Sequence, residues 1–360
     1  MSGPSAPERA LLEATVTEIV TDHCPPEAVA TAEGSWNEGL WDALRAAGLT
    51  AVGVPERLGG SGGDPLDAAA VVRVVAAHAG PVPLAEGLFP VAAGCVAAGL
   101  PFPDGPCTVA AGTGLLLRRT GAGVVLDGAV PRVPYGRVAA RILVADDGAG
   151  DRPGLLALVD PAVLTLAAGD NLAGEPRDDV VAAGSEVATD LVAEVPRGTA
   201  TALRRLGALA RATQIAGAVD EVLALTVRYA GEREQFGRPI GRLQAVAHQI
   251  AVLAGHAAAG SAAADAAVAA YVRTAEPDDL ALAVAGAKVR AGAAAGSAAR
   301  IAHQVHGAIG FTQEHRLHHL TRRLWSWREE FGSEAYWAEQ LGRAIVHAGA
   351  DALWPTITRI

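Results

Sequence analysis

Five histidines lie close together near the C-terminus of the sequence, at His303, His306, His315, His318 and His319. A spacing of three residues places two imidazoles on one face of a helix, where they could bind a metal ion. No cysteine lies nearby and acidic neighbours are few, and histidine often has a structural role instead. We therefore interpret the cluster as structural or surface histidines and predict no metal site.

Short motifs of the common nucleotide, hydrolase and zinc sites are missing from the sequence. There is no GxxxxGK[ST], no GxGxxG after a strand-like run, and no GxSxG, HExxH or paired CxxC. The three cysteines, Cys24, Cys95 and Cys107, are scattered and fit neither a disulfide framework nor a zinc ligand set. P-loop, Rossmann, serine hydrolase and zinc-enzyme interpretations therefore have little support.

Composition and charge exclude further classes. The chain is 51% hydrophobic, which predicts a large buried core, and its formal net charge of −10 disfavours a nucleic-acid partner. Polar residues follow Met1 in place of a basic and apolar leader. The longest uncharged apolar run, 250–264, is too short and too interrupted to span a bilayer. We expect a soluble, cytoplasmic protein without a membrane partner.

The elements that must position any site follow from hydrophobic periodicity. Helical spacing extends through most of residues 1–105, short Val-, Leu- and Ile-rich runs alternate with Gly, Asp and Pro over 106–196, and helical spacing returns over 197–360. We predict a mostly α fold with three domains: an N-terminal helical domain, a small middle β domain and a C-terminal helical bundle. The sequence predicts helices near 68–78, 246–272, 280–306 and 337–347, strands near 123–126, 140–144 and 155–159, and a loop over 54–65.

Two C-terminal segments and one N-terminal segment carry a more specific pattern. The first reads REQFGRPI at 233–240 and is followed by Gln244; the second reads QVHGAIGFTQEH at 304–315. Near the N-terminus, GLWDAL at 39–44 precedes the VPE and GG motifs within 54–60. In order and spacing, these blocks resemble the acyl-CoA dehydrogenase family over nearly the whole chain.

The resemblance implies the same helical, β, helical architecture and an FAD bound at a subunit interface. It implies that Arg233 meets the FAD pyrophosphate of a neighbouring subunit, a contact that suits a guanidinium. Phe236 would pack by the adenine and Gln244 would hydrogen-bond near the pyrophosphate; alternatively, Arg233 and Gln244 are solvated polar residues at helix ends. The implied cofactor-binding residues are Arg233, Gln235, Phe236, Gln244, Gln304, His306, Gly307 and Ala308.

The sequence also departs from the family pattern in its β domain. The family's TExxxGSD-type strand corresponds here to CTVAAGTG at 107–114, and its W-[IV]-T-N strand corresponds to VPRVPY at 130–135. Two prolines in the second segment remove backbone donors from the sheet. We expect these changes to reshape the flavin site.

The catalytic base is the second departure. In the family a Glu removes the α-proton of the thioester, and one of its positions lies in a YEG[TS] element that corresponds to 330–333. Phe331 stands at the base position, Glu330 lies one residue earlier, and the family's other base position falls at Gly207. Glu330 is the candidate base if the backbone shifts by one residue; the alternative is a solvated helix charge. Arginines near the family's CoA-binding position are Arg204, Arg205 and Arg211.

The resemblance implies an FAD-dependent acyl-CoA dehydrogenase-like oxidoreductase of lipid metabolism. Its partners would be an acyl-CoA thioester, such as one with a bulky or steroid side chain, and an electron-accepting flavoprotein. Alanine-rich faces within 254–299 favour an oligomer. The resemblance implies that it is a tetramer, either a homo-oligomer or a heterotetramer with a motif-complete acyl-CoA dehydrogenase chain. The alternatives are a non-catalytic structural subunit and a flavin-dependent oxidase or monooxygenase.

Overall fold

The computed structural model describes residues 6–110, 114–121, 123–148, 152–273 and 277–359, and it forms two compact units. The first unit comprises Met1–Ala14, Thr31–Ala68 and Pro81–Ala210, and the second comprises Thr15–Ala30, Ala69–Gly80 and Arg211–Ile360. The α-helices are α1 (Ala6–His23), α2 (Pro26–Thr31), α3 (Glu38–Ala46), α4 (Pro65–Ala77), α5 (Leu84–Glu86), α6 (Ala92–Ala98), α7 (Thr199–Glu232), α8 (Gln244–Val272), α9 (Pro277–His306), α10 (Leu317–Trp327), α11 (Glu334–Ala348) and α12 (Ala350–Arg359).

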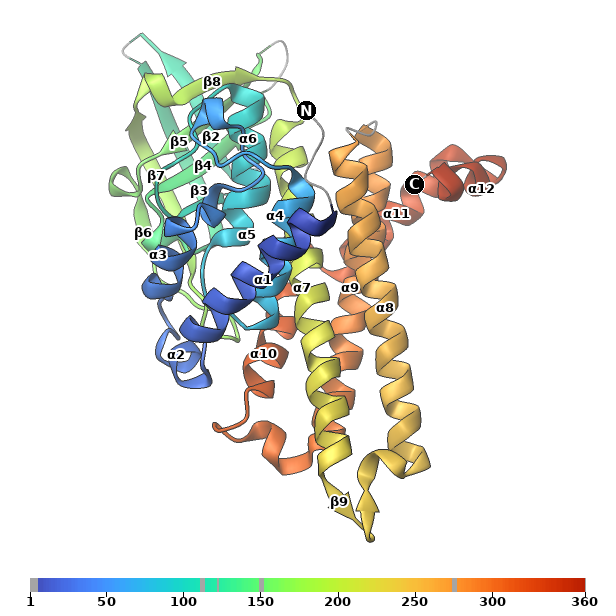
Figure 1. Ribbon diagram of the computed structural model, residues 1–360. Coiled ribbons are helices and arrows are strands. Elements are labelled where there is room, and N and C mark those ends of the chain that lie inside the picture. The colour runs from blue at the N-terminus through green and yellow to red at the C-terminus, as the bar shows by residue number, and fades with distance from the viewer. Residues whose placement is uncertain (1–5, 111–113, 122, 149–151, 274–276, 360) are drawn as a thin grey trace. The chain divides into compact units, whose positions relative to one another are not determined.

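Eight of the strands belong to the first unit (Figure 1). They form two four-stranded sheets, with the orders β1-β4-β5-β8 and β2-β3-β7-β6. Only β1 and β4 pair in parallel among these strands as described; the other pairs are antiparallel. The strands are β1 (Cys107–Ala110), β2 (Leu115–Thr120), β3 (Gly123–Pro134), β4 (Arg141–Asp146), β5 (Gly154–Val159), β6 (Thr165–Ala167), β7 (Arg177–Val187) and β8 (Val192–Val195).

Side chains from both sheets form one apolar core. Leu117 and Leu126 of one sheet and Ile142 and Val144 of the other are completely buried in this core. Helix α6 packs close to the sheet β1-β4-β5-β8, because a Cβ on Gly94 would come within 2.6 Å of Leu143 in β4. A larger residue at this position would therefore displace the Leu143 side chain.

The second unit is a bundle in which long helices pack through small residues. Along α9, most of the buried side chains are alanines, and a Cβ on Gly260 of α8 would lie 3.3 Å from Ala294 of α9. Ser261 of α8 donates a hydrogen bond to Asp220 of α7. Small side chains let helices approach closely. Among the described helices, α8 alone is long and apolar enough to cross a membrane by length and composition, although it packs here against α9.

The predicted fold class is confirmed, and several element boundaries agree closely. The helices predicted near 246–272, 280–306 and 337–347 correspond to α8, α9 and α11. Helices α10 and α12 were not predicted, and the predicted loop over 54–65 contains the short 3₁₀ turn Glu56–Leu58. The described strands of the β domain lie between Cys107 and Val195; the three domain boundaries themselves stay a prediction.

Candidate functional site

The segment REQFGRPI forms a tight hairpin at the end of α7. Strands β9 (Glu234–Gln235) and β10 (Arg238–Pro239) pair antiparallel, and the turn residues Phe236 and Gly237 have φ of 53° and 73°. Positive φ at both central residues is typical of a two-residue hairpin turn that matches strand twist. The turn leaves the Phe236 side chain 88% exposed, and Arg233 and Gln235 are exposed beside it.

The segment around Gln304 forms the end of α9 and the 3₁₀ turn that follows it. Helix α9 ends at His306, and Gly307 has a φ of 61°. No atom lies within 4 Å of a Cβ built on Gly307, so glycine is favoured there by its backbone conformation and leaves open space. Gln304 and Ala308 are exposed.

The fold brings these two segments to the same end of the bundle. The Tyr229 ring near the end of α7 stacks on the His306 ring with 4.5 Å between centroids, and Gln244 is the first residue of α8. Figure 1 shows the hairpin at the end of α7 and α8. His306 differs from the other predicted cofactor residues because its side chain is only 3% exposed. It supports the segment from inside, so only its backbone could approach a cofactor.

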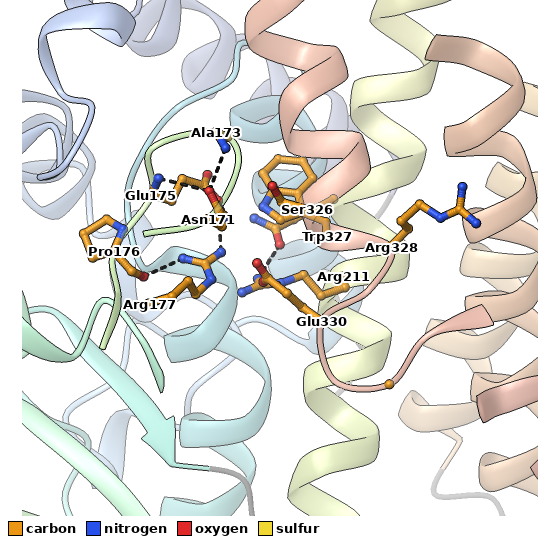
Figure 2. A network of polar contacts seen from close by, with 12 residues as sticks. Asn171, Ala173, Glu175, Pro176, Arg177, Arg211, Ser326, Trp327, Arg328 and Glu330 are labelled. Carbon is orange, nitrogen blue, oxygen red and sulfur yellow. Dashed lines mark hydrogen bonds and ion pairs between the residues drawn. The ribbon is translucent and has the colours of Figure 1, made fainter. Parts of the chain in front are cut away.

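Glu330 forms an ion pair with a buried arginine (Figure 2). Its Oε2 lies 2.7 Å from Nε of Arg211, and the exposed fractions of the two side chains are 12% and 1%. Arg211 also donates to Oε1 of Gln214 at 2.6 Å, and its guanidinium lies 5.3 Å from the centroid of the Phe331 ring. The interpretation of Glu330 as a solvated helix charge is therefore wrong: its carboxylate neutralises a buried cation.

The loop that carries Glu330 is held by Lys288, the only lysine of the chain. Its ammonium donates to the carbonyl oxygens of Arg328 at 2.6 Å, Gly332 at 2.9 Å and Trp327 at 3.3 Å. Burial lowers the pKa of Lys288 from 10.5 to about 7, an effect that the Glu330 carboxylate partly opposes. Phe331 within this loop has a φ of 54°, which is uncommon for a bulky residue and indicates a conformation imposed by its surroundings.

The sequence alone indicated no role for Lys288 and placed Arg211 only near a CoA-binding position. One signal could have identified Lys288: a single lysine within a long alanine-rich helix is unusual. The pairing of Arg211 with Glu330 had no such signal, because the two residues lie 119 positions apart.

Strand β3 is irregular at the proline-containing segment, which was expected to remove backbone donors from the sheet and to reshape the flavin site. Its register against β7 shifts between Val130 and Val133, and Arg132 has a φ of 57° and donates its backbone N–H to Asp179. This irregularity contains Pro131, whose missing N–H is tolerated at a bulge. Of the other divergent segment, β1 is described but residues 111–113 lie outside the described residues.

The clustered histidines pack within the second unit. His303 stacks on Phe311, His306 meets His315 edge to face, and His318 lies 4.0 Å from His319 between ring centroids. In the described part of the chain, no group of three or more side chains suits a metal ion.

Comparison with known proteins identifies the family. The acyl-CoA dehydrogenase N-terminal domain matches residues 6–97 and the C-terminal domain matches residues 197–346. Acyl-CoA dehydrogenase IpdE2 of Mycobacterium tuberculosis is 32% identical over 320 residues, which cover 88% of this chain and 90% of that protein. The chain belongs to the acyl-CoA dehydrogenase family. Members of this family are FAD-dependent oxidoreductases of lipid metabolism and are typically tetramers.

Solved acyl-CoA dehydrogenases share the fold. One chain of the ChsE4–ChsE5 complex from M. tuberculosis superposes with a TM-score of 0.88 at 24% identity. The match covers 97% of the present chain and 100% of the chain from the complex. The steroid ACAD Tcur3481–Tcur3483 gives 0.85 at 25% identity, over 95% and 98%.

The exposed residues at the end of the bundle suit the adenosine diphosphate half of FAD. Arg233 offers a guanidinium for a diphosphate, and Phe236 offers an exposed ring for adenine. Gln244 and Gln304 add exposed amides, and Gly307 leaves the backbone open to close approach. The residues present therefore fit this half of the cofactor, and their contact with FAD stays a prediction.

Proposed function

We propose that this chain is the subunit of a heteromeric acyl-CoA dehydrogenase that does not supply the catalytic base. A second, motif-complete chain would supply the base and complete a site for a bulky acyl-CoA thioester, such as one with a steroid side chain. The observation that carries this proposal is the ion pair between Glu330 and Arg211.

A general base needs a carboxylate that can reach the substrate and accept its proton. Glu330 is held instead against the buried Arg211 guanidinium at 2.7 Å, so protonating it would leave a buried cation without its counter-ion. Phe331, at the family's base position, has no group that can take a proton, and neither has Gly207 at the alternative position. No described residue at either position can therefore remove the α-proton.

The relatives support a heteromer and a steroid-type substrate. The ChsE4–ChsE5 structure is a complex of two different chains, and Tcur3481–Tcur3483 is described as a steroid ACAD. Both cover nearly all of this chain. We extend these properties to the present chain as part of the proposal, together with an electron-accepting flavoprotein partner and a soluble, cytoplasmic location.

This chain would contribute the diphosphate and adenine contacts of FAD through Arg233, Phe236, Gln244 and Gln304. When bound, FAD would be the acceptor of a hydride from the acyl chain. Two alternatives remain open to the same test: Glu330 acts as a base in its own right, or the chain binds no complete flavin and is purely structural.

Purification of the chain alone and together with a motif-complete partner tests the proposal. We expect the pair to retain FAD and to show flavin bleaching by an acyl-CoA, whereas the chain alone shows no bleaching. Bleaching by the chain alone would contradict the proposal, and a pair that holds no flavin at the site formed by Arg233 would favour the purely structural subunit. Oxygen consumption with peroxide or a hydroxylated product would indicate an oxidase or monooxygenase.

A further inference from the structure

The turn after α9 is supported by an imidazole cluster that is formed by His303, His306 and His315. His303 stacks on Phe311 with 4.1 Å between ring centroids. The rings of His315 and His306 pack edge to face, with 4.8 Å between their centroids. These contacts attach the segment 307–315 to α9 and, through the stacking of His306 on Tyr229, to α7. The segment includes Gly307 and Ala308, which were predicted to face FAD.

The hydrogen bonds of the cluster fit neutral rings. Nδ1 of His306 lies 2.8 Å from the carbonyl oxygen of Ala302, so this nitrogen carries the proton and Nε2 carries a lone pair. Nε2 of His306 and Nδ1 of His303 are buried and have no hydrogen-bond partner within the described residues. A proton added at either buried nitrogen would gain no acceptor there, which makes the charged ring costly.

The surroundings add further positive charge close to the rings. Arg228 and Arg316 both oppose protonation of His315, and His318 opposes protonation of His303 and His315. The nearby carboxylates of Glu232 and Glu314 are exposed, so solvent screens their effect on the rings. Charged and titratable groups that face the cluster are Arg228, Glu232 and Glu221 of α7, Glu314 and Arg316 beside His315, and His318 of α10.

We propose that this imidazole cluster is an acid-sensitive latch, which holds the segment 307–315 closed while its rings are neutral and releases the segment when they become protonated. When the segment opens, His315 moves into water and water reaches His303 and His306 on α9, so the charged forms are solvated and the repulsion between the rings is reduced. Opening of the segment is therefore coupled to proton uptake.

The direction of the pH dependence follows from the same contacts. Burial lowers the pKa of His303, His306 and His315 from 6.5 in the closed segment. Below pH 6.5 the open segment binds more protons than the closed one, so closure weakens as pH falls and is fully retained above pH 6.5. For each proton taken up on opening, the equilibrium constant for opening rises by up to about tenfold for every unit by which the pH falls.

Hydrogen exchange of the full chain tests the latch without any cofactor. We expect exchange of the peptide 307–315, corrected for intrinsic rates, to rise about tenfold or more between pH 6.5 and 5.5. His306→Phe keeps a ring against Tyr229 but cannot take up a proton, so its slope should be smaller, and His315→Phe should act in the same way. The exposed His347 of α11 provides a matched control, and His347→Gln should keep the wild-type slope.

Wild-type exchange that does not change with pH would overturn the latch, even if neither variant folds. Equal slopes in the wild type and in both ring variants would overturn it as well. A consequence for FAD rests on the proposed function and is measured separately, as release of flavin fluorescence from the assembled complex over the same pH range. Segment opening without flavin release would contradict only the cofactor assignment and would leave the latch standing.

Discussion

The carboxylate of Glu330 lies 2.7 Å from Nε of the buried Arg211. In the sequence it is a carboxylate one position from where a base is expected; in the structure it is the counter-ion of Arg211. The exposed pair of Arg343 and Glu339 on α11 contributes little by comparison, because solvent screens its charges. Burial of the Arg211 guanidinium is what makes the carboxylate at Glu330 necessary for the fold.

Arg233→Ala tests the cofactor assignment at the level of a single side chain. Loss of a charge-assisted contact to a diphosphate costs about 1.5–3 kcal/mol, so FAD affinity of the assembled complex should fall tenfold or more. The measurement is a titration of FAD into the complex. Arg242→Ala is the matched control, because Arg242 is exposed in the neighbouring turn but outside the two motif blocks. Unchanged affinity in Arg233→Ala would show that this guanidinium does not bind FAD.

The ammonium group of Lys288 holds the loop that connects α10 to α11 through hydrogen bonds. Three carbonyl oxygens converge on one ammonium group, which therefore holds the end of α10 and the backbone on both sides of Glu330. The folded protein nevertheless disfavours the charge, because burial lowers the pKa of Lys288 to about 7. Between pH 7 and 10.5 the unfolded chain consequently binds one proton more than the folded chain at this residue.

We expect the free energy of unfolding to rise with pH above 7, by up to about 1.4 kcal/mol per pH unit from this group. Lys288→Met should remove that part of the slope in urea unfolding measured from pH 7 to 9. Since the chain has only one lysine, lysine-selective isotope labelling gives a single side-chain resonance for direct titration. A pKa near 10.5 in that titration, or an unchanged slope in the variant, would contradict this account.

Long elements were predictable from the sequence, and contacts between distant elements were not. Helices α8 and α9 have sustained spacing and alanine-rich faces, so their extents were predicted within a few residues. Helix α10 was not predicted, although Leu317, Leu320, Leu324 and Trp327 recur at helical spacing and are buried. The hairpin and the turn at Gly307 were found through a motif, but the stacking of Tyr229 on His306 that joins them depends on packing between α7 and α9. The same holds for Arg211, whose partner is set by the fold alone.

One exposed face of α8 consists of small residues that suit contact with another subunit. Ala251, Gly255, Ala258 and Ala262 are exposed and recur at helical spacing along one side of this helix. A flat face of small residues suits close contact with a helix of another subunit, in agreement with the tetramers typical of the family.

Ala258→Glu places a charge on this face and should dissociate the assembly, as measured by light scattering. Ala338→Glu on α11, which is also exposed, is the matched control and should leave the mass unchanged. A wild-type protein that stays monomeric with and without a partner chain would rule out the interface.

In the proposed function, this chain does not provide the base. The most direct test of this proposal is single-turnover flavin bleaching by an acyl-CoA, measured on the assembled complex with Glu330→Gln. We expect FAD and thioester binding to persist and the bleaching rate to change by less than about threefold, well under one kcal/mol in barrier. Stability should fall by about 1.5–3 kcal/mol, because Arg211 loses a charged hydrogen-bond partner. A bleaching rate reduced by about 10²–10⁴-fold with FAD still bound would contradict the account and identify Glu330 as the base.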